Sequence, residues 1–203
     1  MTYLIRHPAE IAILTGQHVV LSFGSLAIAL VIALPLGVVV ARNARFGGVT
    51  LAVLGVIYTI PSLALLAFLA SVFGLGTVSA IVALVAYAQM ILVRNIAAGL
   101  RGVDRGQLEA ATGLGFTPLQ RLIRIELPQA LPTIVGGIRI AAVSLIAVAT
   151  VASYIHAGGL GDLLFEGIHQ DYPQKIIAGS VAAASLAIVA DLLLRRAETL
   201  VRS

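Results

Sequence analysis

The sequence predicts an all-α membrane protein with five transmembrane helices. Of its 203 residues, 60% are hydrophobic and only 11% are charged, whereas a soluble domain carries about a quarter charged residues. Mean hydropathy is +1.05. Five apolar stretches approach or exceed the roughly 20 residues that a bilayer-spanning helix needs. This composition excludes a disordered chain, a coiled coil and a nucleic-acid-binding domain, because each of these needs many more polar groups.

The five stretches are predicted to form one membrane domain over residues 1–203. The spans are expected at about 18–41, 47–73, 78–93, 130–154 and 176–194, with one long polar loop at about 94–129. Small residues are frequent in the spans, and they let helix backbones approach closely. Pro35 and Pro61 each leave a backbone carbonyl without its helical partner. Both features favour a packed, bending bundle.

The basic residues predict how the bundle is oriented. Arg6 and Lys175 fall on one side of the membrane, and ten arginines fall on the other: Arg42, Arg45, Arg94, Arg101, Arg105, Arg121, Arg124, Arg195, Arg196 and Arg202. Lys and Arg are retained on the cytoplasmic face. We therefore expect the N-terminus outside, and the C-terminus and the long loop in the cytoplasm. The formal charge of +4 is then a signal of topology.

The long loop contains two helix starts separated by a glycine corner. Each start has a capping residue with a glutamine three positions later, the spacing of a capping box: Asp104 with Gln107, and Thr117 with Gln120. Gly113 and Gly115 permit a sharp turn between two short amphipathic helices. After the turn, an apolar stripe is expected, with Arg121 and Arg124 turned away from it: Leu119, Leu122 and Ile123.

The same loop carries residues at a characteristic spacing: Glu109, Ala110, Ala111, Gly115, Ile125, Leu127 and Pro128. This pattern resembles the EAA signature of permease subunits of binding-protein-dependent ABC importers. The resemblance implies a type I ABC importer (MetI-like) permease core in a bacterial or archaeal cytoplasmic (inner) membrane. It also implies that the loop is a coupling helix, which docks on an ATP-binding subunit. A solvated loop with ordinary helix caps is the alternative.

Further segments resemble importers of particular substrates. Residues 60–66 (IPSLALL), Arg94-Asn95 and residues 99–104 (GLRGVD) are similar to glycine betaine, choline and carnitine importers. Residues 157–162 (AGGLGD) contain a Gly-Gly-Leu-Gly element that methionine permeases share. The resemblance therefore implies an osmoprotectant importer, with a methionine or other amino-acid importer as the alternative.

The chain has no GxxxxGK[ST] nucleotide-binding motif. No cofactor is therefore expected in it; ATP and Mg would be bound by a partner ATPase subunit, and the chain itself would be non-catalytic. The resemblance implies two ATP-binding subunits per transporter, a second permease copy or a paralogue, and an extracytoplasmic solute-binding protein. The lipid bilayer is the remaining partner, and no nucleic acid is expected.

Six polar side chains in the spans are candidates for a translocation path: Tyr58, Ser62, Gln89, Ser144, Thr150 and Ser153. Each is alternatively a hydrogen-bond partner between helices. A quaternary ammonium is usually held over aromatic faces, and the chain has no Trp. We therefore expect a mostly neutral path here and an aromatic cage in the binding protein. An ATP-independent secondary transporter or channel is a weaker alternative, because the spans offer almost no polar coupling site at mid-membrane.

The remaining charged residues are given structural interpretations. Asp191 is expected to pair with Arg195 one turn later, and Arg139 is expected to reach the inner surface along its aliphatic stem. Glu166 and His169 have a spacing compatible with zinc, but a solvated loop is favoured, so no metal site is predicted. No catalytic constellation is present that would indicate an intramembrane enzyme.

Overall fold

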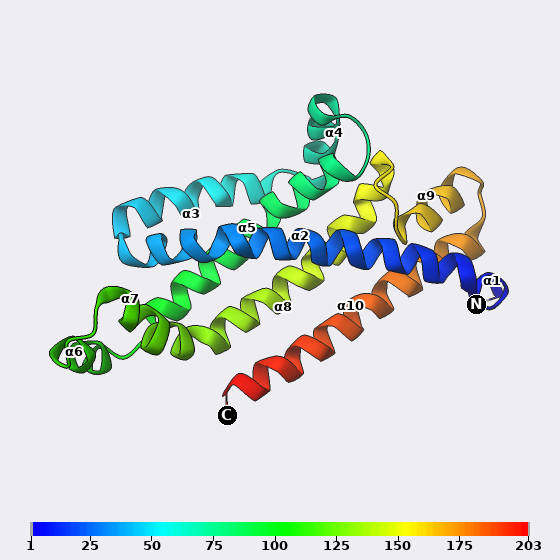
Figure 1. The fold of residues 1–203 in the computed structure, drawn as a ribbon. Helices are drawn as coiled ribbons and strands as arrows, with labels where there is room; N and C mark the ends of the chain where they lie inside the picture. The colour runs from blue at the N-terminus through cyan, green and yellow to red at the C-terminus, as the bar shows by residue number, and fades with distance from the viewer. Residues whose placement is uncertain (1, 203) are drawn as a thin grey trace.

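The computed structural model describes residues 2–202, and it confirms a wholly helical fold without strands over that range (Figure 1). The first half contains α1 (Thr2–Arg6), α2 (Pro8–Arg42), α3 (Ala44–Thr59), α4 (Ser62–Phe73) and α5 (Thr77–Arg101). The second half contains α6 (Arg105–Gly113), α7 (Pro118–Arg121), a π-helical turn (Leu122–Glu126), α8 (Leu127–Ala152), a 3₁₀ turn (Ser153–Ile155), α9 (Gly161–His169) and α10 (Pro173–Arg202).

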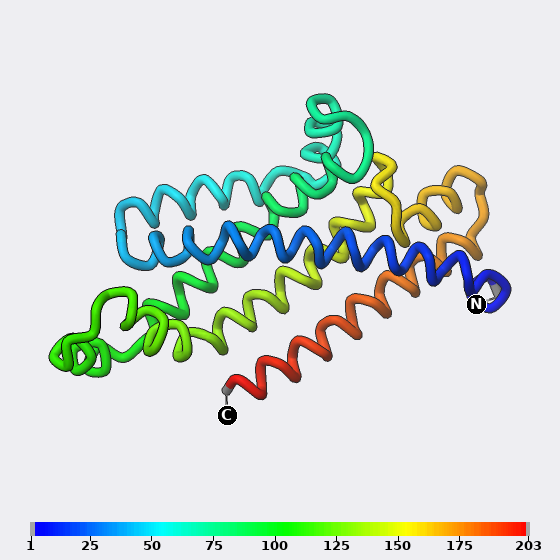
Figure 2. The backbone as a smooth tube through the Cα atoms, viewed as in Figure 1, coloured from blue at the N-terminus to red at the C-terminus, as the bar shows by residue number. Residues whose placement is uncertain are grey.

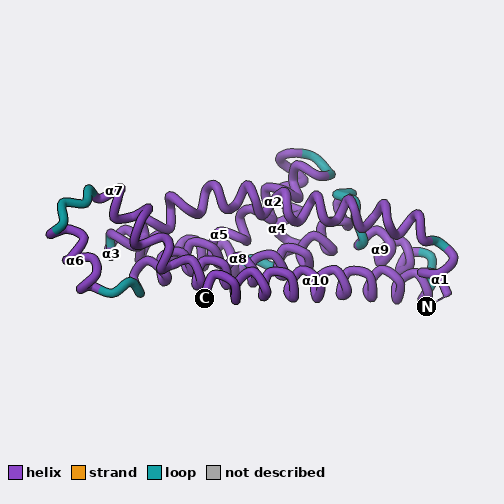
Figure 3. Tube along the Cα trace, turned by 60° about the horizontal axis from the view of Figure 1, so that its bottom comes forward, coloured by secondary structure: helices purple, strands orange, loops and turns teal. Residues whose placement is uncertain are grey.

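The long helices form an elongated bundle with a small helical element at each end. Figure 2 shows α6 and α7 at one end of the tube and the N-terminus, α1 and α9 at the other. Helix α10 runs from α9 back toward the end that carries α6. Turned by 60°, the molecule shows its loops gathered mainly at the ends of the helices, while α4 projects from the bundle (Figure 3). Two separate polar ends are thus joined by apolar helices.

Four helical segments are long and apolar enough to cross a membrane: Pro8–Arg42, Thr77–Arg101, Pro118–Ile155 and Pro173–Val201. The segment expected as a continuous second span, 47–73, is instead broken into α3 and α4, which are bent by 94°. They make a fifth crossing only if the bent pair counts as one. Helices α2, α5 and α10 also extend beyond the bounds expected for the first, third and fifth spans.

Pro61 explains the break between α3 and α4. A residue that precedes proline is forced out of the helical region, and Ile60 adopts extended angles of φ −64 and ψ 128. The Tyr87 hydroxyl donates to the Ile60 carbonyl, so a side chain from α5 satisfies a backbone acceptor at the break. Pro61 therefore causes the kink, and the hydrogen bond from Tyr87 stabilises it.

Helix α5 lies at the centre of the bundle and packs against α2, α3, α4 and α8. Its buried face is rich in alanine, and glycines on the neighbouring helices allow close approach. A Cβ atom built on Gly37 of α2 would lie 2.5 Å from Ile96 Cγ2, and one built on Gly137 of α8 would lie 2.5 Å from Asn95 Cβ. Small residues thus set the helix separation, as the composition predicts.

A charged cluster joins α8 to α10. Arg139 Nε lies 3.0 Å from Asp191 Oδ1, and its Nη1 lies 2.9 Å from Glu198 Oε2. The prediction that Asp191 pairs with Arg195 is therefore wrong, and Arg139 is held by a neighbouring helix. Asp191 and Glu198 are seven residues apart, which places them two turns apart on one helix face. The planar guanidinium can bind both carboxylates from that face.

The glycine packing makes a testable prediction about stability. Replacing Gly137 with alanine should lower the thermal unfolding temperature in detergent, because overpacking costs about 1–3 kcal/mol. Gly55→Ala is the matched control: its Cβ would meet nothing within 4 Å, and alanine stabilises an open helix position by about 1 kcal/mol. Equal unfolding temperatures for Gly137→Ala and the parent protein would contradict the close approach of α5 and α8.

Candidate functional site

The end of the bundle that carries α6 and α7 is a tight elbow, residues 104–126. Asp104 caps the N-terminus of helix α6, and its carboxylate accepts the Gln107 N–H at 3.0 Å. After α6, Gly115 adopts a φ of +82, and the Phe116 N–H donates to the Ala111 carbonyl at 3.1 Å. Glycine suits this left-handed conformation because it lacks a Cβ. The first capping interaction and the glycine corner thus form as the sequence predicts.

The second arm of the elbow begins with a complete capping box. The Gln120 N–H donates to Thr117 Oγ1 at 3.3 Å, and the Thr117 N–H donates to Gln120 Oε1 at 2.9 Å. This arm is not the separate short helix that the sequence suggested. It continues through the π-helical turn into α8, so that Pro118–Ile155 forms one helical segment of 38 residues. The elbow is therefore built directly onto a candidate membrane span.

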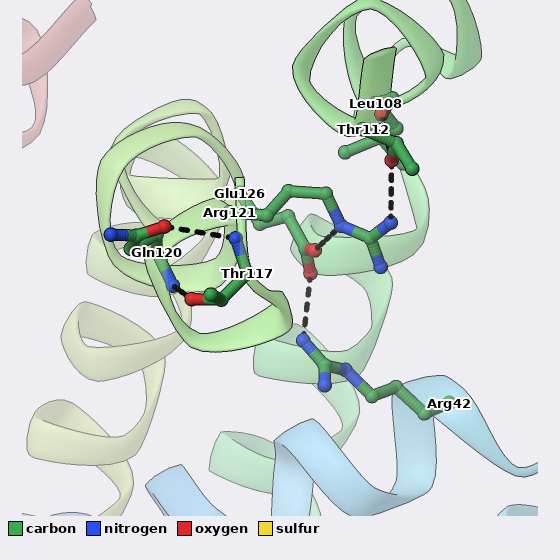
Figure 4. Close-up of polar contacts among 7 residues, drawn as sticks. All are labelled: Arg42, Leu108, Thr112, Thr117, Gln120, Arg121 and Glu126. Carbon is green, nitrogen blue, oxygen red and sulfur yellow. Dashed lines mark hydrogen bonds and ion pairs between the residues drawn. The ribbon is translucent and has the colours of Figure 1, made fainter. Parts of the chain in front are cut away.

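A buried carboxylate fastens the elbow to the bundle (Figure 4). Glu126 is only 6% exposed. It accepts from Arg121 Nε at 2.8 Å and lies 3.5 Å from an Arg42 nitrogen at the end of α2. Arg121 also donates to Thr112 Oγ1 of α6 at 3.3 Å. Arg121 thus turns inward, in contrast to the sequence-based expectation, and the network joins α2, α6 and the start of α8.

Sequence reasoning missed Glu126 because helical pairing rules do not connect it to Arg121. The two are five residues apart, whereas side chains on an α-helix pair at three or four. The π-helical turn changes this register: the Leu127 N–H bonds to the Leu122 carbonyl, the i to i+5 pattern of a π-helix. The available signal was a lone acid, Glu126, among three arginines of the same arm and of α2.

The signature residues fall into three groups by exposure. Glu109 and Ala110 are exposed on α6, whereas Ala111 is buried under it; Gly115 is exposed at the corner. Ile125 and Leu127 are half-buried, and Pro128 is exposed. Two further apolar side chains project from the elbow: Leu114 is 78% exposed and Leu119 is 64% exposed. An exposed tip of this kind, on a fastened base, is suited to contact with another protein.

Three of the six candidate path residues meet at the α3–α4 break. Tyr58, Ser62 and Ser144 line a pocket of about 260 Å³ together with Tyr87. The Tyr58 and Tyr87 rings lie 6.0 Å apart at 77°, an edge-to-face arrangement. Tyr58 is 44% exposed, so the pocket opens at the surface of this chain. Its polar lining consists of neutral groups.

The other three candidates lie elsewhere and make hydrogen bonds within the chain. Gln89 donates from Nε2 to the Ala29 carbonyl at 3.1 Å, which ties α5 to α2. The Thr150 hydroxyl donates to the Ile146 carbonyl at 3.1 Å. Ser153 donates to the Gly158 carbonyl at 2.8 Å, and it lines a different pocket beside α9. Gln89 and Thr150 thus line neither of these two pockets.

Known proteins resemble the chain over most of its length. Residues 33–203 match the family described as "Binding-protein-dependent transport system inner membrane component". The carnitine transport permease protein OpuCB of Listeria monocytogenes is 36% identical over 98% of this chain and 91% of its own length. The choline transport system permease protein OpuBB of Bacillus subtilis is 40% identical, covering 97% of this chain and 90% of its own. The osmoprotectant import permease protein OsmW of Salmonella typhimurium is 38% identical, covering 96% and 93%.

Solved structures share the fold at lower identity. A chain of the MetNI methionine ABC transporter in an inward-facing conformation gives a TM-score of 0.86 at 24% identity, covering 96% of this chain and 98% of its own. A chain of an amino acid ABC transporter solved with histidines gives a TM-score of 0.71 at 20% identity, covering 98% and 95%. At these identities the likeness shows a common fold.

The buried carboxylate makes a prediction about local stability. Glu126→Gln should raise amide hydrogen exchange in α6 and α7 about tenfold, because loss of the charge-assisted bonds to the half-exposed arginines costs about 1.5 kcal/mol. Exchange in α9 should not change. Arg124→Gln, an exposed charge in the same π-helical turn, is the control. Equal protection of α6 in the two variants would show that Glu126 does not fasten the elbow.

Proposed function

The chain belongs to the family of binding-protein-dependent transport system inner membrane components, and from this premise we propose that it carries small osmoprotectants across the membrane. The family provides the non-catalytic permease subunits of ABC importers, in which a separate subunit hydrolyses ATP. The chain is accordingly a multi-pass membrane protein. The observation that carries the proposal is the similarity to permeases of carnitine, choline and osmoprotectant systems over nearly the whole chain.

The proposed substrates are glycine betaine, choline and carnitine, which share a quaternary ammonium group. The pocket at the α3–α4 break supports this choice, because its Tyr58 and Tyr87 rings offer aromatic surface to such a group. The neutral lining would let a cation or zwitterion pass without holding it tightly. A methionine or other amino-acid substrate is the second candidate, and the shared fold of the methionine transporter supports it only at the level of architecture.

We place the elbow in the cytoplasm and α9 outside, as the arginine distribution favours. Glu109, Ala110, Ala111 and Gly115 would then contact an ATP-binding subunit, with Ile125, Leu127 and Pro128 shaping the base of the elbow. Movement of a docked subunit would reach α2 through Arg42 and α8 through the π-helical turn, because Glu126 binds to both sides. ATP and substrate would each favour the state that they bind more tightly.

The proposed transporter contains two permease chains. The Tyr58 pocket opens at the surface of a single chain, so a second copy or a paralogue would be needed to close the path. Two elbows would also serve two ATP-binding subunits. A solute-binding protein outside the membrane would deliver the substrate to the α9 end. Within a bacterial or archaeal cytoplasmic membrane, this arrangement supports alternating access.

Docking can be tested by charge reversal at the elbow. Glu109→Lys should abolish co-purification of the cognate ATP-binding subunit from detergent, because it reverses an exposed charge on the docking arm. Asp171→Lys makes the same reversal in an exposed residue beyond α9 and should leave co-purification unchanged. The unfolding temperature of each variant checks that the bundle remains folded. Retention of the subunit by Glu109→Lys would refute the docking role.

The substrate can be tested in vesicles that contain the permease, its ATP-binding subunit and its binding protein. We expect ATP-dependent uptake of radiolabelled choline, carnitine or glycine betaine, and no uptake with a hydrolysis-deficient ATP-binding subunit. Uptake of methionine without any of the three ammonium compounds would replace the osmoprotectant assignment with the amino-acid alternative. Uptake that persists without ATP would contradict the importer mechanism itself.

A further inference from the structure

A second, larger pocket lies beside α9. Helix α9 is at the end of the bundle opposite the elbow (Figure 1). The volume of the pocket is about 680 Å³, within the range of about 300–1,000 Å³ that is usual for small-molecule sites. Its walls come from the 3₁₀ turn after α8, the loop that follows that turn, α9 and Gln17 of α2. We call it the α9 pocket.

Two aromatic rings form part of the pocket wall. Tyr154 and Phe165 both line it, and their ring centroids lie 5.4 Å apart at an interplanar angle of 58°. Tilted rings at this distance support each other while leaving ring faces available. Ring faces carry negative electrostatic potential and attract cations, and quaternary ammonium groups are recognised in this way. The wall therefore favours a ligand that carries a diffuse positive charge.

The pocket also contains a carboxylate that is not paired with a described lysine or arginine. Glu166 lines the pocket but pairs with Lys175. Asp162 lines it too, and no Lys or Arg among residues 3–201 forms an ion pair with Asp162. Burial, followed by the nearby charge of Glu166, raises the pKa of Asp162 above its ordinary value, whereas His156 and Ser153 lower it. A bound cation would stabilise the ionised form against both main causes of the shift.

The frame of the α9 pocket is held from several sides. His18, fully buried in α2, accepts the Leu160 N–H on Nδ1 at 3.2 Å and donates from Nε2 to the Ile146 carbonyl at 3.0 Å. Gly161 approaches α8 so closely that an added Cβ would lie 2.1 Å from the Thr150 carbonyl oxygen. The turn before α9 is thus fixed to both α2 and α8, and the pocket is formed before any ligand arrives.

We propose that the α9 pocket is a capture site for the quaternary ammonium group of the substrate, with Tyr154 and Phe165 against the methyl groups and Asp162 as the counter-charge. This inference rests on the proposed function, because that function supplies the ammonium compounds and places α9 outside. The site would take substrate released by the binding protein before the substrate reaches the Tyr58 pocket. Its exposed ring, Tyr154 at 53%, makes it a weak site, as a transfer point must be.

Binding is tested on the purified permease with its ATP-binding subunit, without the binding protein, using tetramethylammonium as the probe. Saturation-transfer NMR should show binding that Asp162→Asn or Tyr154→Leu weakens about tenfold, the loss expected for a counter-charge or a cation–π partner. The neutral analogue 3,3-dimethylbutan-1-ol should compete poorly, because it has the shape of choline without the charge. Equal binding of the two compounds would overturn the proposal.

Matched control variants separate the pocket from its surroundings. Asp171→Asn removes a carboxylate, and Tyr172→Leu removes a ring, from the loop that follows α9; neither side chain lines the α9 pocket. Both controls should bind tetramethylammonium as the parent protein does. Equal loss of binding in Asp162→Asn and Asp171→Asn would indicate general surface charge and refute the site. Unfolding temperatures identify any variant that fails to fold, and Tyr154→Leu and Asp162→Asn provide independent tests.

Uptake in complete vesicles then distinguishes this inference from the proposed function. If the capture site operates, choline uptake by Asp162→Asn should require about tenfold more choline-loaded binding protein for half-maximal rate, with Asp171→Asn unchanged. Wild-type uptake together with unaltered Asp162→Asn uptake would refute the capture site and leave the proposed function intact. Absence of ammonium-compound uptake by the wild-type complex would refute the proposed function instead.

Discussion

The ion pairs of Glu126 are the constraint on which the proposed transmission of force depends. A polar elbow attached to apolar helices can change its orientation unless contacts hold it in place. Here the buried carboxylate of Glu126, between two arginines, holds the elbow. Removal of both arginines would leave an uncompensated buried charge on Glu126. The arrangement is therefore costly to disrupt, and it joins the end of α2 to the start of α8. A force that a docked subunit exerts on the elbow would therefore move both helices together.

The break at Pro61 is the second constraint, because it sets where the bundle can bend. A continuous helix over 47–73 would satisfy its own backbone and leave Tyr87 without a carbonyl to bind. The proline instead produces a turn of 94° between α3 and α4, and the Tyr87 hydroxyl binds the Ile60 carbonyl at that turn. The same tyrosine faces the pocket with Tyr58. A single interaction thus supports the kink and places an aromatic ring beside the proposed path.

Features with a local cause were predictable from the sequence, and features that need a neighbouring helix were not. Helicity, the caps at Asp104 and Thr117 and the corner at Gly115 follow from residue type and spacing. The partner of Asp191 could not be predicted in this way, because Arg139 on another helix competes with Arg195, which is nearer in sequence. The Arg121–Glu126 pair depends on a π-helical register that no local rule indicates. The α9 pocket brings Gln17 beside residues of the later loop, and only the folded bundle creates that contact.

The two pockets differ in charge, and this difference suits passage better than two similar sites would. A carboxylate beside the Tyr58 pocket would lie among apolar helices, where an ionised group is costly without a partner and would hold a cation strongly once it arrived. At the α9 end, the pocket is open and water can share the cost of ionisation, so Asp162 can attract a cation without trapping it. A charged α9 pocket at the entrance would therefore select the cationic substrate, and a neutral Tyr58 pocket inside would release it afterwards. In this scheme the energy for release comes from the change in helix positions that the elbow imposes, not from a stronger site further along the path.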